Sequence, residues 1–274
     1  MSESNPGNPA VEQWIQKRGT EVAAPAFSLV IPAYNEYRRL PSTLMEIIDY
    51  LDSRISNGSL TSYEIIVVDD GSKDGTADLV RKFEKIRPQV KLIQLPRNYG
   101  KGHAVRLGVL NAHGERVLFA DADGATPIAE LERLSKALDE GADVAFGSRA
   151  LLSKETRVTT SWMRKYPGRI FNLLMNVLVL PGIADSQCGF KLFTAKSARF
   201  LFERQQCDGW TFDVELLYLA RRAGLCAKEV SVNWTNVAGS KVNLLTDSLR
   251  MLKDLFIFRL RHRAVGPNDY ASVS

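Results

Sequence analysis

The sequence has few cysteines and histidines and no long hydrophobic run. Its 274 residues include three histidines and three cysteines, Cys188, Cys207 and Cys226. An odd number of widely spaced cysteines suits neither a disulfide framework nor a zinc site, so we expect free thiols. No stretch reaches the roughly 20 apolar residues that a membrane-spanning helix needs, and residues 1–20 lack the apolar core of a secretory signal. We therefore expect a cytoplasmic chain that does not cross a bilayer.

The charge balance is mildly basic, with a net charge of +5. Such a balance fits an anionic partner, which could be nucleic acid, a nucleotide or an anionic membrane surface. A nucleic-acid binder would interleave basic and aromatic residues on one face. The basic candidates for phosphate contact in this chain instead gather around acidic residues, so we expect no nucleic-acid partner.

Short apolar runs alternate with helical patterns from about residue 27 to 144, which is typical of βαβ units and a mostly parallel sheet. The chain length suits one α/β domain at 25–264, with a nucleotide-binding half at about 25–150, an acceptor half at about 151–264, and flexible tails at 1–24 and 265–274. We expect strands at 27–31, 64–68, 90–93, 116–120, 142–146 and 229–234. Helices are expected at 40–51, 76–86, 104–111, 170–180, 213–223 and 249–263.

Two aspartates follow the expected strand at 116–120, and ligands of such sheets bind beyond the carboxyl ends of the strands. Asp121 and Asp123 are two residues apart, so both carboxylates can reach one hard cation while Ala122 points the other way. The alternative is a solvated Asp-Gly turn. Their position directly after an apolar strand favours a Mg²⁺ or Mn²⁺ site that bridges a diphosphate.

A second acidic pair, Asp69 and Asp70, follows the strand at 64–68 and could accept hydrogen bonds from a uracil ring or a ribose. Capping of the next turn or helix is the structural alternative, and both roles can coexist. The glycine-rich segment 97–102 opens a helix where backbone N–H groups could meet phosphate. It matches neither the phosphate-loop nor the dinucleotide-binding pattern, which argues against a nucleotide hydrolase and a dehydrogenase.

Four motifs in order carry a resemblance to a known family. The segments 30–36 (VIPAYNE), 68–72 (VDDGS), 98–102 (NYGKG) and 121–124 (DADG) resemble the inverting family 2 nucleotide-sugar transferases. More narrowly, the segments 121–126, 147–149, 185–193, 210–215, 232–235 and 239–241 resemble the dolichyl-phosphate β-glucosyltransferases. The resemblance covers roughly residues 27–263. It implies a GT-A fold, in which helices flank a Rossmann-like, mostly parallel sheet and amphipathic helices lie in the C-terminal half.

The resemblance also implies roles for individual residues. The nucleotide sugar would be bound by Pro32, Tyr34, Glu36, Val68, Asp70, Lys101, Ala120, Asp121, Ala122, Asp123, Arg149 and Lys241. The catalytic set would be Asp121, Asp123, Asp185, Lys191 and Arg149, with Mg²⁺ or Mn²⁺ held by Asp121 and Asp123. The acceptor phosphate would be bound by Arg164, Lys191, Ser240 and Lys241. Asp213 is a further candidate for a base or orienting group, unless it caps the helix that follows it.

Two positions separate this chain from the mannosyl relatives. They have a glutamine two places after the second metal aspartate and an arginine six places before the lysine, where this chain has Ala125 and Thr235. Both differences favour the glucosyl branch and leave one metal position to water or substrate. The glucosyl relatives usually begin with a membrane-spanning helix, which this sequence does not contain.

The sequence therefore predicts a hexosyltransferase that moves glucose from UDP-glucose to a polyprenyl, dolichyl-type phosphate with inversion. A phosphate monoester carries about −1.5 to −2 charges near neutral pH and needs no strong general base to attack. One alternative is a mannosyl or other hexosyl transferase that uses GDP-mannose or a different acceptor. Another is a non-catalytic nucleotide-sugar or membrane-binding module, against which the intact pair of Asp121 and Asp123 argues.

The expected helices at 170–180 and 249–263 are amphipathic, and the second is rich in arginine and lysine. A basic amphipathic helix can lie in an anionic membrane interface. The alternative is that its apolar face packs on the core while its basic face is solvated. With a lipid acceptor, we expect a peripheral protein on the cytoplasmic face of a membrane.

Overall fold

The structure, a computed structural model, describes residues 24–151, 153, 155–159, 180–237 and 254–273. Its centre is a seven-stranded sheet with the order β3-β2-β1-β4-β7-β5-β8. The strands are β1 (Phe27–Ala33), β2 (Tyr63–Asp69), β3 (Val90–Gln94), β4 (Arg116–Ala120), β5 (Val144–Ser148), β7 (Phe190–Thr194) and β8 (Ala227–Ser231). A second small sheet pairs β6 (Val158–Thr159) with β9 (Trp234–Thr235). The mostly parallel sheet expected from the sequence is confirmed.

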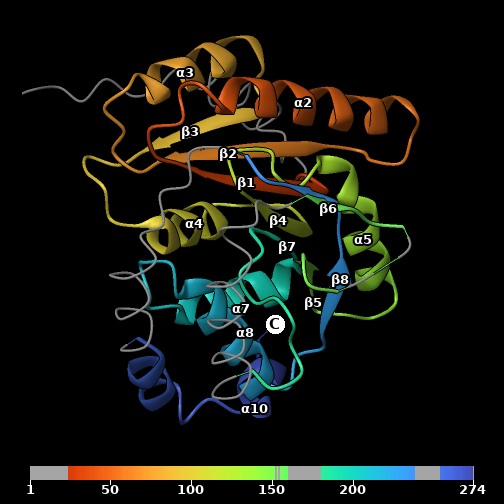
Figure 1. Cartoon of the computed structure of the whole chain (residues 1–274), viewed down its shortest axis with the longest axis vertical. Coiled ribbons are helices and arrows are strands. Elements are labelled where there is room, and N and C mark those ends of the chain that lie inside the picture. Colours follow the sequence, from red (N-terminus) through yellow and green to blue (C-terminus); the bar gives the residue numbers. More distant parts are fainter. Residues whose placement is uncertain (1–23, 152, 154, 160–179, 238–253, 274) are drawn as a thin grey trace, which may run out of the picture.

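Helices cover both faces of the sheet (Figure 1). One face packs against α2 (Leu40–Ser56), α3 (Thr76–Ile86) and α5 (Leu131–Asp139), which follows the short helix η1 (Ile128–Glu130). The other face packs against α4 (Lys101–Leu110), α7 (Ala195–Arg204) and α8 (Phe212–Arg222). Along β1 the fully buried side chains alternate between the two layers, with Leu29 and Ile31 in the first and Val30 in the second. This two-sided burial is why the strands read as unbroken apolar runs.

Strand β7 runs antiparallel between β4 and β5. The sequence indicated a motif at 185–193 but did not predict a strand there. Because β7 is antiparallel to β4, its first residue, Phe190, lies opposite Ala120, the last residue of β4. The loop before β7 therefore meets the loop after β4, at the edge where the paired aspartates were expected.

The C-terminal segment is not the flexible tail that was expected. Residues Pro267–Ala271 form a short helix, α10, and the hydroxyl of Tyr270 donates to Asp143 at 2.7 Å. The Tyr270 ring also lies edge-on to Phe200, with centroids 5.3 Å apart. Val265 and Val273 also pack against the core on this side of the sheet, so three side chains hold a segment whose composition suggested a flexible tail. The expected N-terminal tail at 1–24 lies outside the described residues except for its last position.

Residues 254–261 are helical and form the described part of the helix expected at 249–263. Nearly all of the helix expected at 170–180 lies outside the described residues. Among the helices that the structure describes, none is long and apolar enough to cross a membrane. All three cysteines are free, as expected.

Candidate active site

Asp121 and Asp123 lie at the carboxyl end of β4, and each faces a cation from another element. The ammonium of Lys101, the first residue of α4, is 2.6 Å from Oδ1 of Asp121. The guanidinium of Arg39, just before α2, is 3.6 Å from Oδ2 of Asp123. The structure thus brings together three residues that the sequence assigned to one site, and adds Arg39, which the sequence did not.

The charges at this edge of the sheet interact strongly. Burial, followed by the neighbouring charge of Asp121, raises the pKa of Asp123. Burial lowers the pKa of Lys101, but the carboxylates of Asp121 and Asp213 outweigh that effect and leave it raised. The site therefore holds carboxylates whose mutual repulsion is only partly offset by the cations beside them.

The donor set fits a hard divalent cation. Mg²⁺ and Mn²⁺ prefer oxygen ligands and commonly bind through one or two carboxylates together with substrate phosphates. Asp121 and Asp123 offer two such carboxylates, with side chains 36% and 26% exposed. No cluster of three or more potential metal ligands of the His, Cys, Asp or Glu type occurs within the described ranges. A metal held by this pair would take its other ligands from the diphosphate and water.

Lys101 is also surrounded by aromatic rings. Its ammonium lies 5.2 Å from the ring centre of Phe119, 5.3 Å from that of Trp210 and 5.9 Å from that of Phe212. A cation over an aromatic face is stabilised electrostatically. These rings fix the lysine beside Asp121 without adding negative charge.

Asp70 organises the glycine-rich loop. Its Oδ1 accepts from the backbone N–H of Tyr99 at 2.7 Å, and its Oδ2 accepts from that of Gly100 at 2.9 Å. Gly100 has φ +114, and a Cβ there would lie 2.4 Å from the carbonyl oxygen of Asp208. Only glycine suits this position. Asp70 was expected to bind the nucleoside, and the structure shows that both of its oxygens hold the loop.

Asp69 differs from Asp70 in having one carboxylate oxygen without a hydrogen-bond partner within the described part of the chain. It is fully buried, its Oδ2 accepts from the N–H of Ser72 at 3.3 Å, and its Oδ1 has no hydrogen-bond partner among the described residues. Burial raises its pKa. A buried oxygen without a partner is costly, so a donor supplied by a ligand would be favoured. A cavity of about 360 Å³ lies over the ends of β2 and β3, lined by Gly71, Ser72, Lys73, Gln94, Leu95 and Pro96.

Glu36 binds Arg39 rather than standing apart as a nucleoside ligand. The guanidinium of Arg39 donates to the Glu36 carboxylate at 2.7 and 2.5 Å, and the same guanidinium faces Asp123. The spacing of three residues was the only sequence signal for this pair. Other residues expected to bind the donor lie at the same strand ends. Tyr34 directly follows β1. Four more have buried side chains and lie within a strand or next to one: Pro32, Val68, Ala120 and Ala122.

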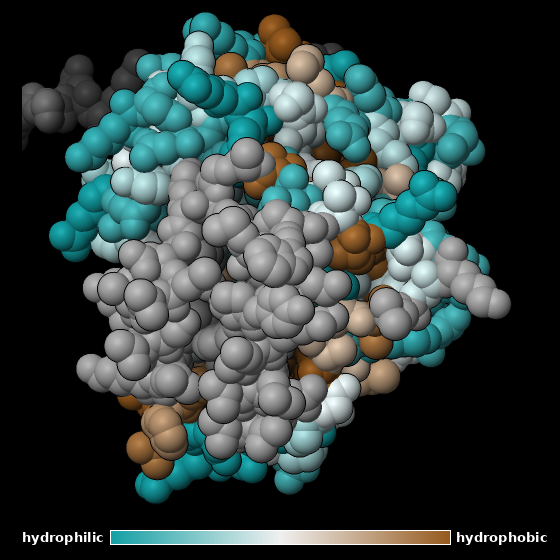
Figure 2. All heavy atoms as spheres, viewed as in Figure 1, coloured by the Kyte–Doolittle hydropathy of each residue, from teal (hydrophilic) through white to brown (hydrophobic). Residues whose placement is uncertain are grey.

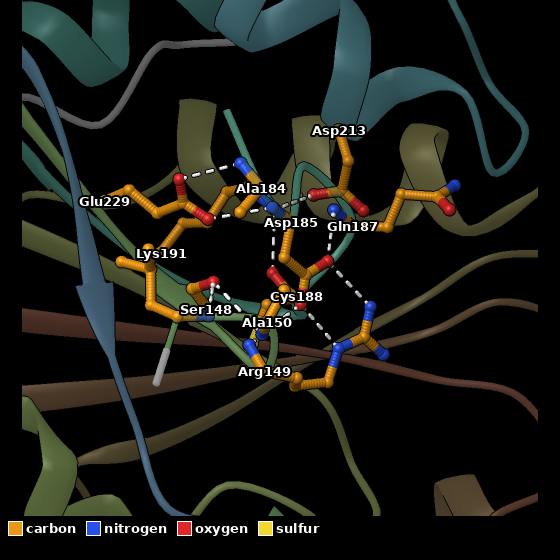
Figure 3. Close-up of polar contacts among 11 residues, drawn as sticks. Ser148, Arg149, Ala150, Ala184, Asp185, Gln187, Cys188, Lys191, Asp213 and Glu229 are labelled. Atoms are coloured by element: carbon orange, nitrogen blue, oxygen red, sulfur yellow. Dashed lines mark hydrogen bonds and ion pairs between the residues drawn. The ribbon is translucent and has the colours of Figure 1, made fainter. Parts of the chain in front are cut away.

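Arg149 and Asp185 form a bidentate ion pair beside the aspartates (Figure 3). Nε and Nη2 of Arg149 donate to the two oxygens of Asp185 at 2.6 and 2.8 Å, and Asp185 also accepts from the Arg149 backbone N–H. Glu229 accepts from the backbone N–H of Asp185 at 2.8 Å. Burial alone would raise the pKa of Asp185, but the Arg149 charge outweighs it and leaves the pKa lowered. Asp185 therefore orients Arg149, and this contact favours the orienting role over the role of a base.

Lys191, which was expected to bind the acceptor phosphate, has a buried side chain. Its side chain is 0% exposed, and its ammonium donates to Asp213 Oδ1 at 2.5 Å and to the Cys188 carbonyl at 2.7 Å. Asp213 lies in the first turn of α8 but makes no capping bond. The other expected acceptor residues, Arg164, Ser240 and Lys241, lie outside the described residues.

Comparison with known proteins places this arrangement in a family. The model of glycosyl transferase family 2 matches residues 28–202. The dolichyl-phosphate β-glucosyltransferase of Mus musculus is 43% identical, over 86% of this chain and 75% of its own. The chain belongs to glycosyltransferase family 2. The enzyme of the same name from Saccharomyces cerevisiae is 36% identical, over 86% of this chain and 74% of its own.

Solved structures confirm the GT-A fold of this family 2 glycosyltransferase. Glucosyl-3-phosphoglycerate synthase of Mycobacterium tuberculosis, solved with Mn²⁺ and UDP-glucose, has a TM-score of 0.60 and 18% identity, covering 96% of this chain and 86% of its own. The mannosyltransferase PcManGT of Pyrobaculum calidifontis, solved with GDP-Man and Mn²⁺, has a TM-score of 0.57 and 19% identity, covering 97% of this chain and 75% of its own. The dolichyl-phosphate β-glucosyltransferase relatives at 36–43% identity show that the chain is an enzyme, and not the non-catalytic module considered as an alternative.

Proposed function

We propose that this enzyme transfers glucose from UDP-glucose to dolichyl phosphate with inversion, aided by Mg²⁺ or Mn²⁺ at Asp121 and Asp123. The observation that carries the proposal is the 43% identity, over 86% of the chain, to a dolichyl-phosphate β-glucosyltransferase. Relatives named for the same activity from other organisms are 36–42% identical. The carboxylate pair at the end of β4 supplies the chemistry that this activity needs.

The reaction is a single displacement. A phosphate oxygen of the acceptor forms a bond to the anomeric carbon, the bond from that carbon to the donor diphosphate breaks, and UDP leaves with the bonding pair. Attack from the opposite face converts an α-linked donor into a β-linked product. When bound, the metal neutralises charge on the departing diphosphate. The protein mainly positions both substrates and supplies cationic groups, because the phosphate is already an anionic nucleophile.

Lys101, Arg39 and Arg149 each bind a carboxylate at this edge of the sheet. Lys101 holds Asp121, and Arg39 links Glu36 to Asp123. Arg149, held in orientation by Asp185, remains 32% exposed and is our candidate to contact phosphate. We retain Arg164, Ser240 and Lys241 as proposed acceptor contacts.

The nucleoside end of the donor would lie at the ends of β2 and β3. A uracil ring presents one N–H, which matches the buried Oδ1 of Asp69 that has no partner within the described residues. The cavity of about 360 Å³ over these strand ends offers room for such a group. Guanine also presents an N–H, so GDP-mannose is the competing donor, as bound in the structural neighbour from Pyrobaculum calidifontis.

A lipid acceptor requires contact with a membrane surface, and we propose the helix at 254–261 for part of that contact. Phe256 and Leu260 are one turn apart on this helix and are 65% and 67% exposed. Arg259, Arg261 and Arg263 are exposed beside them. Figure 2 shows hydrophobic atoms at the lower left, where Figure 1 places this helix. Exposed apolar and basic side chains together suit an anionic leaflet, and we place the enzyme on the cytoplasmic face.

Donor and acceptor specificity can be tested in one experiment. Purified enzyme is supplied with labelled UDP-glucose or GDP-mannose, and with dolichyl phosphate or 3-phosphoglycerate in detergent. The proposal predicts a labelled lipid only from UDP-glucose with dolichyl phosphate, with β stereochemistry by NMR. Labelled lipid from GDP-mannose alone would replace the donor, and transfer to 3-phosphoglycerate alone would replace the acceptor.

A further inference from the structure

The buried ion pair of Lys191 and Asp213 lies behind the two aspartates, in the interior of the sheet. Lys191 is on β7, opposite Phe119 of β4 and Phe146 of β5. Its side chain is 0% exposed and that of Asp213 is 3% exposed. Neither group can touch a lipid phosphate without a rearrangement of the core, so the pair must act on something else.

One contact of Lys191 leads to Asp121 through the backbone. The ammonium holds the carbonyl of Cys188 at 2.7 Å (Figure 3). The next residue, Gly189, accepts from the backbone N–H of Asp121 at 3.0 Å. A Cβ on Gly189 would lie 2.0 Å from Oδ2 of Asp121. The loop that Lys191 holds through Cys188 therefore contacts the Asp121 carboxylate at Gly189.

The second contact leads to Asp121 through side chains. Asp213 accepts from Lys191, and the ring centre of its neighbour Phe212 lies 5.9 Å from the ammonium of Lys101. Lys101 in turn contacts Asp121 at 2.6 Å. Positive and negative groups thus alternate from the interior to the site, in the order Lys191, Asp213, Lys101, Asp121.

Stability alone does not account for such a pair. Burying two charges costs several kcal/mol per ion, roughly what their attraction returns, and apolar side chains of the same volume are often as good or better. We therefore explain the buried pair of Lys191 and Asp213 by its effect on the position of the groups that it contacts. Groups that orient a metal ligand commonly change metal affinity about 10–100-fold when they are removed.

We propose that Lys191 and Asp213 are positioning residues that set Asp121 for the metal and the donor diphosphate, through Gly189 on one side and Lys101 on the other. This inference rests on the proposed function, because it takes Asp121 as a metal ligand. The proposal gives Lys191 a role in binding of the metal and the donor diphosphate, in place of the expected role in binding the acceptor phosphate.

The test uses Lys191→Met combined with Asp213→Asn, which removes both charges and leaves no unpaired ion in the core. Mn²⁺ binding in the presence of UDP is measured by electron paramagnetic resonance, and KM is measured for donor and acceptor separately. We expect about tenfold weaker Mn²⁺ binding and a raised KM for UDP-glucose, with an unchanged KM for dolichyl phosphate. Melting curves establish that the variant folds.

The matched control removes an exposed ion pair, with Lys228→Met and Glu140→Gln, and should bind Mn²⁺ as the wild type does. If the buried double variant does not fold, Asp213→Glu serves, since it keeps both charges of the pair and changes only the position of the carboxylate; we expect weaker Mn²⁺ binding than in the wild type. Wild-type Mn²⁺ affinity in whichever variant folds overturns the proposal, and a raised KM for the acceptor alone restores Lys191 to the acceptor site. A wild-type enzyme that binds no Mn²⁺ with UDP overturns the metal in the proposed function and this inference with it.

Discussion

Gly189 lies against the carboxylate of Asp121 with no space between them for a side chain. The two residues come from β7 and β4 loops that are far apart in sequence, and the backbone N–H of Asp121 donates to the Gly189 carbonyl at 3.0 Å. An added Cβ would lie within 2.0–2.6 Å of the carboxylate atoms. The position of the first metal aspartate therefore depends on the absence of a side chain at residue 189.

Replacing Gly189 by alanine should displace the Asp121 carboxylate while leaving the fold intact, because the crowded atoms belong to a movable side chain. A shift of about 1 Å at a reacting group can cost about 100-fold in rate, so we expect transfer to fall by that order. Steady-state transfer assays with a melting curve measure both effects. Gly209→Ala is the matched control, since nothing lies within 4 Å of its added Cβ. Equal activity of the two variants would contradict the account.

Asp123→Asn should stabilise the metal-free protein while abolishing its activity. The pKa of Asp123 is raised above 3.8 by burial and by Asp121, so the folded chain binds the proton more tightly than the unfolded chain. Ionised Asp123 therefore lowers stability above the raised pKa, and this cost disappears as the pH falls toward 3.8. In EDTA we expect the variant to melt a few degrees higher at pH 7 and to approach the wild type near pH 4. A melting temperature of the variant below that of the wild type at pH 7 would show that burial and the charge of Asp121 do not make ionised Asp123 destabilising.

Asp185→Asn should destabilise the fold by leaving Arg149 without its charged partner. Removing one member of a fully buried pair costs about 3–5 kcal/mol. Because Arg149 is about one-third exposed, we expect about 2–3 kcal/mol. The folded-state pKa of Asp185 is lowered, so this stability is present above its ordinary value of 3.8 and is lost as the pH falls below it. Urea unfolding should show a large difference between wild type and variant at pH 7 and still near pH 4, and this difference should shrink as the pH is lowered toward 2.

Replacing Phe256 and Leu260 by serine should weaken membrane binding without affecting the fold, because both side chains are mostly exposed. Flotation with vesicles that contain phosphatidylserine should recover less of the variant than of the wild type. Added salt should also weaken vesicle binding of the wild type, because it screens the attraction between the arginines and the anionic lipid. Ile86→Ser is a matched control, since Ile86 is 73% exposed on α3. Equal flotation of all three proteins would assign membrane contact to another part of the chain.

The sequence allowed much of the fold to be predicted because local patterns determine most of it. Strands β1 and β2, which are fully buried, and β4, which is buried except at its first residue, appear as apolar runs, and acidic motifs follow or end them. Strand β7 was missed because its second position holds Lys191, and a lysine within a five-residue run hides the apolar pattern of a buried strand. The packing of α10 was missed because it depends on contacts of Tyr270 with Asp143 and Phe200, which lie in distant parts of the chain.

The site was predicted in its composition but less well in its contacts. The motif identified Asp121, Asp123 and Lys101, and the structure brings them together. The partners of Asp70 and Lys191 could not be read from the sequence, since each binds backbone groups positioned by the tertiary fold. Arg39 was overlooked because its contact with Asp123 joins two elements that only the tertiary fold brings together.

The most direct test of the account is transfer of glucose from UDP-glucose to dolichyl phosphate by wild type, Asp121→Asn and Asp123→Asn, each with Mg²⁺, Mn²⁺ or EDTA. We expect a β-linked glucosyl lipid from the wild type with metal, none in EDTA, and a loss of about 10³-fold in each variant. The Lys228→Met/Glu140→Gln protein should retain wild-type rates. Metal-independent transfer, or full activity in either aspartate variant, would contradict the central claim that these two carboxylates hold the metal that the reaction requires.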